Sequence, residues 1–271
     1  MFRPVKLRQH LAWMVAKGYS PSDVLADSGT TEEQLLNPSC LIDLRQYKTI
    51  VGNILNLTGD HGIGLEFGEM TELRDCGMLG HLVMSAQTTR QATRYWIDYS
   101  HELLGEPFSI KLVENGTEDW ALEFSELIPL GRILNFCVEE QFMMIYKLSG
   151  RISSAPPKLK RVELSYSAPP HGDLYEKYFK APVKFNAAKT RITILTHRLD
   201  LPLLDNDQEF HEICQRQCEL MFRKIHQVDS MASKIKHVLM RFKGGVPGME
   251  EVARELNVSA RTLRRHLIEE G

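Results

Sequence analysis

The chain has 271 residues, of which 43% are hydrophobic and 25% are charged, so it is long enough to bury a core and is not a disordered chain. Its 33 Lys and Arg against 35 Asp and Glu give a formal net charge of -2, which excludes a basic field over the whole chain for gripping nucleic acid. No apolar run approaches the roughly 18 residues of a membrane span, and the N-terminus lacks the unbroken apolar region of a signal peptide. Five cysteines without regular spacing indicate a reduced protein, and we expect a cytoplasmic location.

Charge is distributed unevenly along the chain. Residues 1–229 carry 25 basic and 30 acidic side chains, whereas residues 230–271 carry 8 basic and 5 acidic ones. Within the second block, residues 256–268 contain three arginines and one histidine and no acid. A change of sign between segments predicts that the two parts of the chain have different roles.

The first hundred residues are patterned as helices. Apolar residues recur at spacings of three and four, which is the period of one helix face. Ser20-Pro21, Thr31 and Asp43 are typical helix starts, because their side chains accept hydrogen bonds from free backbone N–H groups. The pattern predicts helices at 5–17, 21–27, 31–36, 43–57, 79–85 and 89–104.

Strand patterning begins at Phe108. Residues 108–114 and 119–124 alternate between apolar and polar side chains, and Asn115-Gly116 between them predicts a hairpin. Downstream we expect helices at 132–149 and 173–179 and strands at 159–166 and 191–196. Residues 1–204 are therefore predicted to form one α+β domain.

After Pro202 the pattern is helical. Residues 207–227 form an amphipathic helix inside a helical linker that we place at 205–229. Its apolar stripe is wider than a spacer needs, so we expect it to pack on its own domain or in a two-fold dimer. The stripe consists of Phe210, Ile213, Cys214, Leu220, Met221 and Ile225. Ser230 caps a further helix that ends near Phe242.

Residues 230–271 end in a predicted helix-turn-helix. Met249–Leu256 forms one helix with Val252, Ala253 and Leu256 facing inward. Asn257-Val258 is the turn, since asparagine tolerates the left-handed backbone that a tight corner demands. Ser259 is the N-cap of a second helix with Leu263 and Leu267 inside. Two short helices joined in this way form a helix-turn-helix, whose second helix enters the major groove of DNA.

The outward face of the second helix is basic. It presents Arg261, Thr262, Arg264, Arg265 and His266. The forked guanidinium group of arginine suits both guanine edges and phosphates. The alternative is an ordinary helical hairpin with a solvated basic face, and the pattern by itself leaves both interpretations open.

The segment VARELNVSARTLRRHL strongly resembles the first helix-turn-helix of the AraC/XylS family of bacterial transcription regulators. The helix from Ser230 to Phe242 is placed like the opening helix of that family's DNA-binding domain. Residues 1–204 are similar to the effector-sensing domain of the branch related to ornithine-utilisation regulators, and the resemblance covers nearly the whole chain. The similar stretches are Gly62–Gly68, Gly77–Ser85, Ala181–Phe185 and Leu199–Leu203.

The resemblance implies site residues and partners. By position, Arg261, Arg264 and Arg265 would contact DNA bases, while Ser259 and Thr262 would contact phosphate. The implied partners are double-stranded promoter DNA, an unidentified small-molecule effector and a second copy of the chain in a homodimer. Because the sequence has no cofactor motif and no apolar span, we expect no cofactor, no metal and no membrane partner.

One departure from the family's pattern is large. The family's DNA-binding domain has two helix-turn-helix units joined by a long helix, whereas this sequence stops at Gly271 after the first. Either the sequence is a cut piece of a longer protein or the protein is naturally short. We expect the cut, with the DNA-reading role latent in the shorter form.

Two further motifs have competing interpretations. Gly62-x-Gly64-x-x-x-Gly68 is one residue away from a dinucleotide fingerprint, and we interpret it as a glycine-punctuated turn. His211, Cys214 and Cys218 would share one side of a helix and could hold a metal, but packing is the better interpretation because cysteine is a common small core residue. No catalytic motif is present, and we expect no enzymatic activity.

The effector contacts themselves are not readable from the sequence. Five aromatic residues are placed to line a small-molecule cavity between helices and sheet, although each is equally suited to an ordinary core. They are Tyr95, Trp96, Tyr99, Trp120 and Phe124. Two functions remain: an effector-responsive transcription factor, or a stand-alone small-molecule sensor or enzyme whose C-terminal helices support an interface. The basic, acid-free run at 256–268 favours the first.

Overall fold

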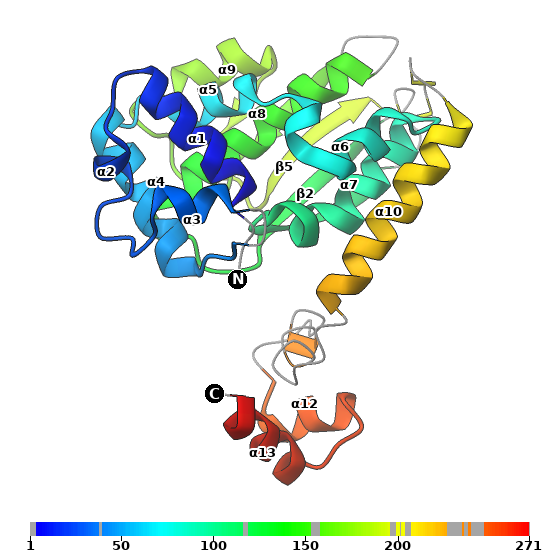
Figure 1. The fold of residues 1–271 in the computed structure, drawn as a ribbon. Coiled ribbons are helices and arrows are strands. Elements are labelled where there is room, and N and C mark those ends of the chain that lie inside the picture. Colours follow the sequence, from blue (N-terminus) through cyan, green and yellow to red (C-terminus); the bar gives the residue numbers. More distant parts are fainter. Residues whose placement is uncertain are drawn as a thin grey trace. The chain divides into compact units, whose positions relative to one another are not determined.

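The chain divides into two compact units, residues 1–218 and residues 219–271. The computed structural model describes residues 4–37, 40–115, 119–152, 158–195, 199–200, 202–203, 207–226, 235, 238–239 and 247–270. Over these ranges, no helix is both long enough and apolar enough to cross a membrane. The first unit is an α+β domain and the described residues after it are helical, as the sequence predicts (Figure 1).

Helices form most of the first unit. They are α1 (Val5–Ala16), α2 (Pro21–Val24), α3 (Glu32–Leu36), α4 (Leu44–Thr58), α5 (Ile63–Met70), the 3-10 helix η1 (Leu73–Cys76), α6 (Gly77–Met84), α7 (Thr89–Leu104), the 3-10 helix η2 (Gly131–Ile133), α8 (Leu134–Ile152), α9 (Asp173–Phe179) and the first half of α10 (Gln208–His226). The predicted starts at Ser20, Thr31 and Asp43 are confirmed, because each side chain accepts a backbone N–H of the helix that follows.

A five-stranded sheet lies beside the helices, in the order β1-β2-β5-β3-β4. The strands are β1 (Phe108–Asn115), β2 (Asp119–Glu126), β3 (Leu159–Glu163), β4 (Val183–Lys184) and β5 (Thr190–Leu195). All neighbours pair antiparallel except β3 and β4, which are parallel. The predicted hairpin is confirmed by the pairing of Asn115 with Asp119, although its turn lies outside the described residues.

The sequence pattern predicts a turn at the glycine motif 62–68. This prediction is wrong, because the motif forms the start and body of α5. Gly62 has φ 83° and precedes the helix, while Gly64 and Gly68 lie within it, one turn apart. A Cβ added to Gly64 would lie 2.6 Å from the carbonyl oxygen of Phe136, and one added to Gly68 would lie 2.5 Å from that of Glu140. The glycines therefore allow α5 to approach the backbone of α8.

Helix α8 carries two adjacent buried carboxylates at this contact. Glu139 accepts a hydrogen bond from the hydroxyl of Tyr175 and pairs with His171 Nε2 at 2.7 Å. Glu140 pairs with His10 Nε2 at 2.9 Å. Both glutamates are at most 2% exposed. Because an unpaired buried charge is strongly unfavourable, these pairs tie α1 and the segment before α9 to the middle of α8.

A partly buried lysine completes the charge balance around Glu140. Lys6 Nζ lies 2.7 Å from Glu106 and 3.5 Å from Glu140. Burial by itself would lower the pKa of Lys6, but the two carboxylates raise it above its ordinary value. Burial opposes ionisation of Glu140, yet Lys6 and His10 lower its pKa to about 2. For Glu106 burial outweighs Lys6 and raises the pKa. Lys6 therefore remains charged and joins α1 to α8.

Replacing the contact glycines tests the close approach of α5 and α8. We expect Gly64→Ala and Gly68→Ala each to destabilise the protein by roughly 1–3 kcal/mol, because the added Cβ meets backbone that cannot yield. Gly52→Ala is the matched control: it also lies inside a helix, but its Cβ meets only the mobile end of the Arg132 side chain. Alanine favours a helix over glycine by about 1 kcal/mol, so this variant should be neutral or stabilising. Urea unfolding gives the three values, and equal effects would contradict the contact.

The His171–Glu139 pair predicts a pH dependence. The hydrogen bond to Glu139 raises the pKa of His171 despite burial of the ring. The charged pair therefore stabilises the fold below the ordinary histidine pKa of about 6.5, and this stabilisation is lost as pH rises through the raised value. Urea midpoints between pH 6 and 9 should fall more steeply for the wild type than for His171→Gln. An equal pH dependence of the urea midpoint in the two proteins would show that the His171–Glu139 pair does not stabilise the fold through a charged histidine.

Candidate functional site

The C-terminal unit contains two short helices around a small core. They are α12 (Met249–Glu255) and α13 (Ala260–Glu270). Val252, Ala253 and Leu263 are buried together, as predicted. Partly buried residues pack against them: Ile235, Val238, Leu256, Val258 and Ala260. Ile235 and Val238 belong to the helix predicted at 230–242, most of which, including its Ser230 cap, lies outside the described residues.

The turn between α12 and α13 has the predicted chemistry. Asn257 is left-handed, with φ 54°. The N–H of Val258 donates to the carbonyl of Ala253, and that of Asn257 to the carbonyl of Arg254, which together close the end of α12 in a Schellman motif. Ser259 Oγ accepts the N–H of Thr262 at 3.1 Å, and this confirms Ser259 as the N-cap of α13. Local hydrogen bonds therefore hold the corner at both ends, at the C-terminus of α12 and at the N-terminus of α13.

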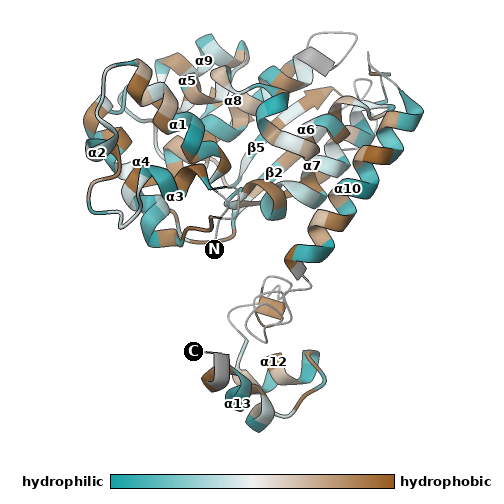
Figure 2. Cartoon of the chain, viewed as in Figure 1, coloured by the Kyte–Doolittle hydropathy of each residue, from teal (hydrophilic) through white to brown (hydrophobic). Residues whose placement is uncertain are grey.

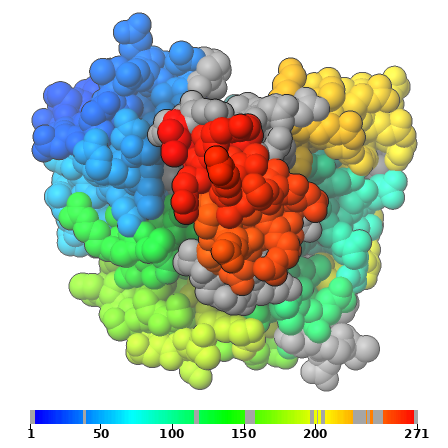
Figure 3. Space-filling view, turned by 90° about the horizontal axis from the view of Figure 1, so that it is seen from below, coloured from blue at the N-terminus to red at the C-terminus, as the bar shows by residue number. Residues whose placement is uncertain are grey.

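The three predicted base-contacting arginines share one face of α13. Arg261, Arg264 and Arg265 are exposed there, opposite the buried Leu263. Figure 3 shows the atoms of α13, in red, on the surface of their unit. Of the two predicted phosphate contacts, Ser259 is exposed and Thr262 half-buried, and their hydroxyls lie 2.8 Å apart at the N-terminus of the helix. The face thus combines forked cations with a helix N-terminus, two groups that bind anions.

Asn257 provides a direct test of this corner. Asn257→Val should destabilise the α12–α13 pair by roughly 1–2 kcal/mol, because a β-branched residue is strained in the left-handed region. Asn257→Gly, the matched control, should leave stability within a few tenths of a kcal/mol, since glycine adopts this backbone freely. Hydrogen exchange of the α12 and α13 amides measures both. Similar exchange in the two variants would show that the turn is not held in this conformation.

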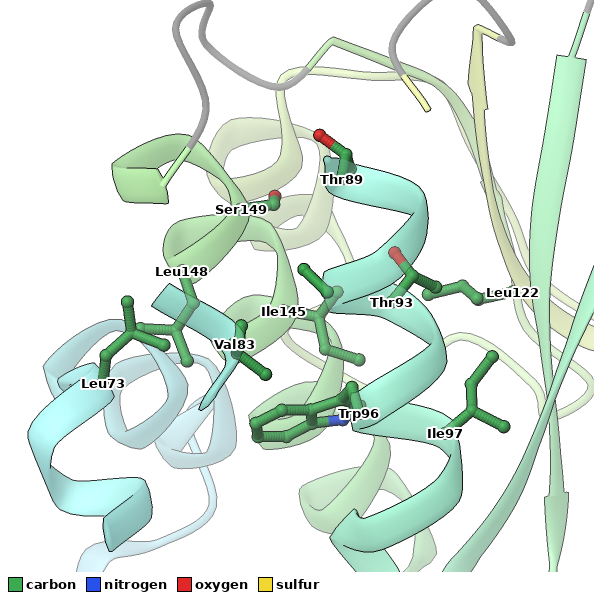
Figure 4. A pocket seen from close by; sticks show the side chains of 11 residues that line it. Leu73, Val83, Thr89, Thr93, Trp96, Ile97, Leu122, Ile145, Leu148 and Ser149 are labelled. Carbon is green, nitrogen blue, oxygen red and sulfur yellow. The ribbon is translucent and has the colours of Figure 1, made fainter. Parts of the chain in front are cut away.

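The first unit contains an apolar cavity between α6, α7, α8 and β2. Its empty space is about 490 Å³, which includes the part that is open to solvent. Figure 4 shows the side chains that line it. They are Leu73, Val83, Thr89, Ala92, Thr93, Trp96, Ile97, Leu122, Ile145, Leu148 and Ser149. No charged side chain is among them.

The cavity has a polar end and an apolar end. The hydroxyls of Thr89, Thr93 and Ser149 lie at one end, and the ring of Trp96 lies at the other (Figure 4). Ser149 Oγ donates to the carbonyl of Tyr146. Thr89 Oγ1 is buried and has no hydrogen-bond partner within the described part of the chain. A buried hydroxyl without a partner is unfavourable, so a hydrogen bond from a polar ligand group to this atom would be stabilising.

Of the five aromatic residues proposed for a cavity, only Trp96 lines this one. Phe124 borders a separate hollow at the edge of β2. Tyr95 lies beside α10, and Tyr99 stacks near it with ring centroids 6.5 Å apart. Trp120 is buried in β2. The sequence analysis missed the other residues of this wall, although the helical spacing of Thr89, Ala92, Thr93 and Trp96 places them on one face of α7.

The first half of α10 packs on the first unit. His211 is 3% exposed; its Nδ1 lies 3.1 Å from Ser85 Oγ and its Nε2 lies 3.0 Å from the hydroxyl of Tyr95. Cys214 and Cys218, on the same side of α10, are also buried. The compact unit therefore extends to Cys218, past the boundary expected at 204, because this face of the helix completes its core.

The same contacts bear on the metal interpretation of α10. Both ring nitrogens of His211 are engaged by hydroxyl groups. Burial raises the pKa of Cys214, and it raises that of Cys218 to about 12, as is typical of cysteines packed in a core. Across the described residues no group of three His, Cys, Asp or Glu is placed to hold a metal. Packing is the role that these contacts support.

A neighbouring side of α10 exposes apolar residues. Phe210, Ile213 and Leu220 are 43%, 53% and 44% exposed, so of the predicted stripe Cys214 is the residue that the first unit buries. Figure 2 shows hydrophobic and hydrophilic residues interspersed along this helix. No strand is found in the described residues between 207 and 270.

Comparisons with known proteins agree with this architecture. The family model of the arabinose-binding N-terminal domain of AraC transcription regulators matches residues 18–203. The ornithine utilization regulator of Pseudomonas aeruginosa is 24% identical over 266 residues, which cover 97% of this chain and 78% of the relative. An uncharacterized HTH-type transcriptional regulator of Mycobacterium tuberculosis is 27% identical, covering 94% of this chain and 75% of its own.

A solved structure supports the fold. The crystal structure of the transcriptional regulator CdpR from Pseudomonas aeruginosa superposes with a TM-score of 0.57 at 19% identity, and the match covers 96% of this chain and 79% of that one. The family match covers more than half of the chain and nearly all of its first unit. The chain therefore belongs to the AraC family of transcription regulators that carry the arabinose-binding N-terminal domain.

Proposed function

We propose that this chain is an effector-responsive transcriptional regulator in which α13 reads the major groove of promoter DNA and the first unit senses a small molecule. The observation that supports DNA reading most strongly is the face of α13. Its three arginines are exposed on the side opposite the buried Leu263, and the corner before them has helix-turn-helix chemistry. A bacterial transcription regulator acts on DNA in the cytoplasm, and we therefore place the protein there.

The roles of the site residues follow from their places on α13. Arg261, Arg264 and Arg265 contact base edges, where a guanidinium group binds guanine through two hydrogen bonds. Ser259 and Thr262 contact a phosphate at the N-terminus of the helix, where free N–H groups and the helix dipole favour an anion. A stand-alone small-molecule sensor is the alternative function, but it has no use for an exposed arginine face.

Homodimerisation is the second part of the proposal. Phe210, Ile213 and Leu220 lie on one side of α10 and expose apolar surface that a two-fold partner would cover. Such a dimer would present two reading helices to paired half-sites. We expect Leu220→Asp to shift the chain from dimer to monomer in light scattering without loss of helix content. Glu212→Asp, an exposed substitution on the same helix, is the control, and a monomeric wild type at high concentration would contradict the dimer.

The DNA proposal is tested with duplexes enriched from a randomised pool and with the starting pool, each at two salt concentrations. One helix-turn-helix neutralises few phosphates, so the 271-residue chain should bind the starting pool weakly, with Kd of roughly 10⁻⁴ to 10⁻⁶ M. In a version of the chain extended with the family's second helix-turn-helix unit, Arg261→Ala or Arg265→Ala should cost about 1–3 kcal/mol on enriched duplexes and relax one base position. Thr262→Ala should weaken binding to both kinds of duplex alike.

The matched control is Arg45→Ala, which removes the same charge from an exposed position on α4. Arg45→Ala should change neither the affinity for the enriched duplexes nor the affinity for the starting pool. Equal losses on enriched and starting duplexes for the α13 arginines would assign them to phosphates instead of bases. Unchanged binding by all three α13 variants would show that this face is an ordinary solvated surface.

A further inference from the structure

We propose that the cavity between α6, α7, α8 and β2 binds a small neutral molecule with an apolar body and one hydroxyl or carbonyl group. The inference rests on the proposed sensing function, to which it adds a location and a ligand chemistry. The cavity is lined entirely by described residues of the first unit. None of the comparisons assigns a ligand to it.

The lining determines the body of the ligand. Aliphatic side chains such as Val83, Ile97 and Leu122 form the walls, and the ring of Trp96 closes the apolar end (Figure 4). A charged group placed here would lose its water without gaining a partner of opposite charge, which is strongly unfavourable. The ligand is therefore neutral, and a single ring or a short alkyl chain matches these walls.

The orphaned hydroxyl of Thr89 determines the polar group. Thr89 is the first residue of α7, and its Oγ1 is buried without a partner inside the described structure. Thr93, one turn later, and Ser149 of α8 place two more hydroxyls at the same end (Figure 4). A ligand hydroxyl or carbonyl at this end would satisfy Thr89, and its apolar body would then point toward Trp96.

Helix α7 connects the cavity to α10. At 3.6 residues per turn, Tyr95 lies on the side of α7 opposite Thr89 and Thr93. The Tyr95 hydroxyl lies 3.0 Å from His211 Nε2 of α10. Helix α7 is thus placed between the cavity and α10, so a ligand that presses on one side of this helix shifts its contact on the other.

Helix α6 makes the second connection. Val83 lines the cavity, and Ser85, just after the end of α6, lies 3.1 Å from His211 Nδ1. The two helices that form these walls therefore both lead to His211. Tyr95 of α7 lies against its Nε2, and Ser85, just after α6, lies against its Nδ1. A ligand that moves α7 relative to α6 changes the distance between the groups that hold His211, and with it the packing of the first half of α10.

Three probes that share one ring test the ligand chemistry: benzyl alcohol, toluene and benzoate. Binding to the full chain is measured by calorimetry, and by intrinsic fluorescence in a Trp13→Phe, Trp120→Phe background that leaves Trp96 as the reporter. Benzyl alcohol should bind saturably. Toluene should bind roughly fivefold more weakly, because it leaves Thr89 without a partner. Benzoate should show no saturable binding, because its charge would be unpaired. Benzoate binding as tightly as benzyl alcohol would overturn the proposal.

Variants of Thr89 separate this site from general effects. Thr89→Val removes the hydroxyl at nearly constant shape, so the fold should be kept while the preference for benzyl alcohol over toluene is lost. Thr89→Ser should retain the preference. Thr193→Val is the matched control, because Thr193 Oγ1 is likewise buried without a partner among the described residues but lies on β5, outside the cavity. A preference that survives Thr89→Val, or is lost in Thr193→Val, would overturn the assignment.

Hydrogen exchange of α10 tests the connection to the helix. Benzyl alcohol should change exchange of the amides between Gln208 and Cys218, and His211→Ala should abolish that change while leaving ligand binding intact. Unchanged α10 exchange at saturation would overturn the coupling. If no probe binds while the chain still binds DNA, the proposed ligand cavity is wrong, but the proposed function as a transcription regulator is unaffected. If probes bind as expected but α13 variants leave DNA binding unchanged, the proposed function is wrong and the site stands.

Discussion

The first unit depends on burying charge at the middle of α8. Glu139 and Glu140 are adjacent on this helix, and each pairs with a histidine from a distant part of the chain, His171 and His10. Removing one partner of a buried pair costs about 3–5 kcal/mol, because the other charge is left without compensation. Such pairs specify which segments may pack on α8, since an aliphatic side chain offers no partner to either carboxylate.

The glycine contact of α5 and these ion pairs fix the same stretch of α8. α7 lies beyond this centre, with the cavity between it and α8. Gln141 connects the two regions: with its amide nitrogen turned toward Glu106, its oxygen accepts the indole N–H of Trp96 at 3.2 Å. The apolar end of the cavity is therefore connected to these buried contacts, whereas its polar end lies near the first turn of α7. In the mechanism that we propose, the wall formed by α7 passes the effect of a ligand on to α10.

Local patterns predict those parts of the fold that local interactions determine. Capping side chains such as Asp43 and Ser259, the hairpin before Asp119, and the left-handed Asn257 were all readable, because each forms hydrogen bonds with residues close in sequence. The exposed arginine face followed from helical spacing in the same way. The family resemblance added the expected function to these elements, and the family match confirms that the chain belongs to the AraC regulators.

Long-range packing explains what the sequence pattern missed. The glycine pattern of α5 predicts a turn because glycine disfavours helices, whereas the benefit of Gly64 and Gly68 exists only against α8. His10 and Glu140 lie 130 residues apart, so their pairing leaves no local signal. The cavity draws its walls from α6, α7, α8 and β2, and four of the five aromatic residues proposed for it lie elsewhere.

The central claim is that one chain couples a small-molecule site to a DNA-reading helix. Coupling between two sites is reciprocal: if the ligand changes DNA affinity by some factor, DNA changes ligand affinity by the same factor. The most direct measurement is calorimetric titration of benzyl alcohol into the chain with and without saturating duplex DNA. The account predicts different dissociation constants in the two titrations, and no difference once His211 is replaced by alanine. Identical constants for the wild-type chain would contradict it.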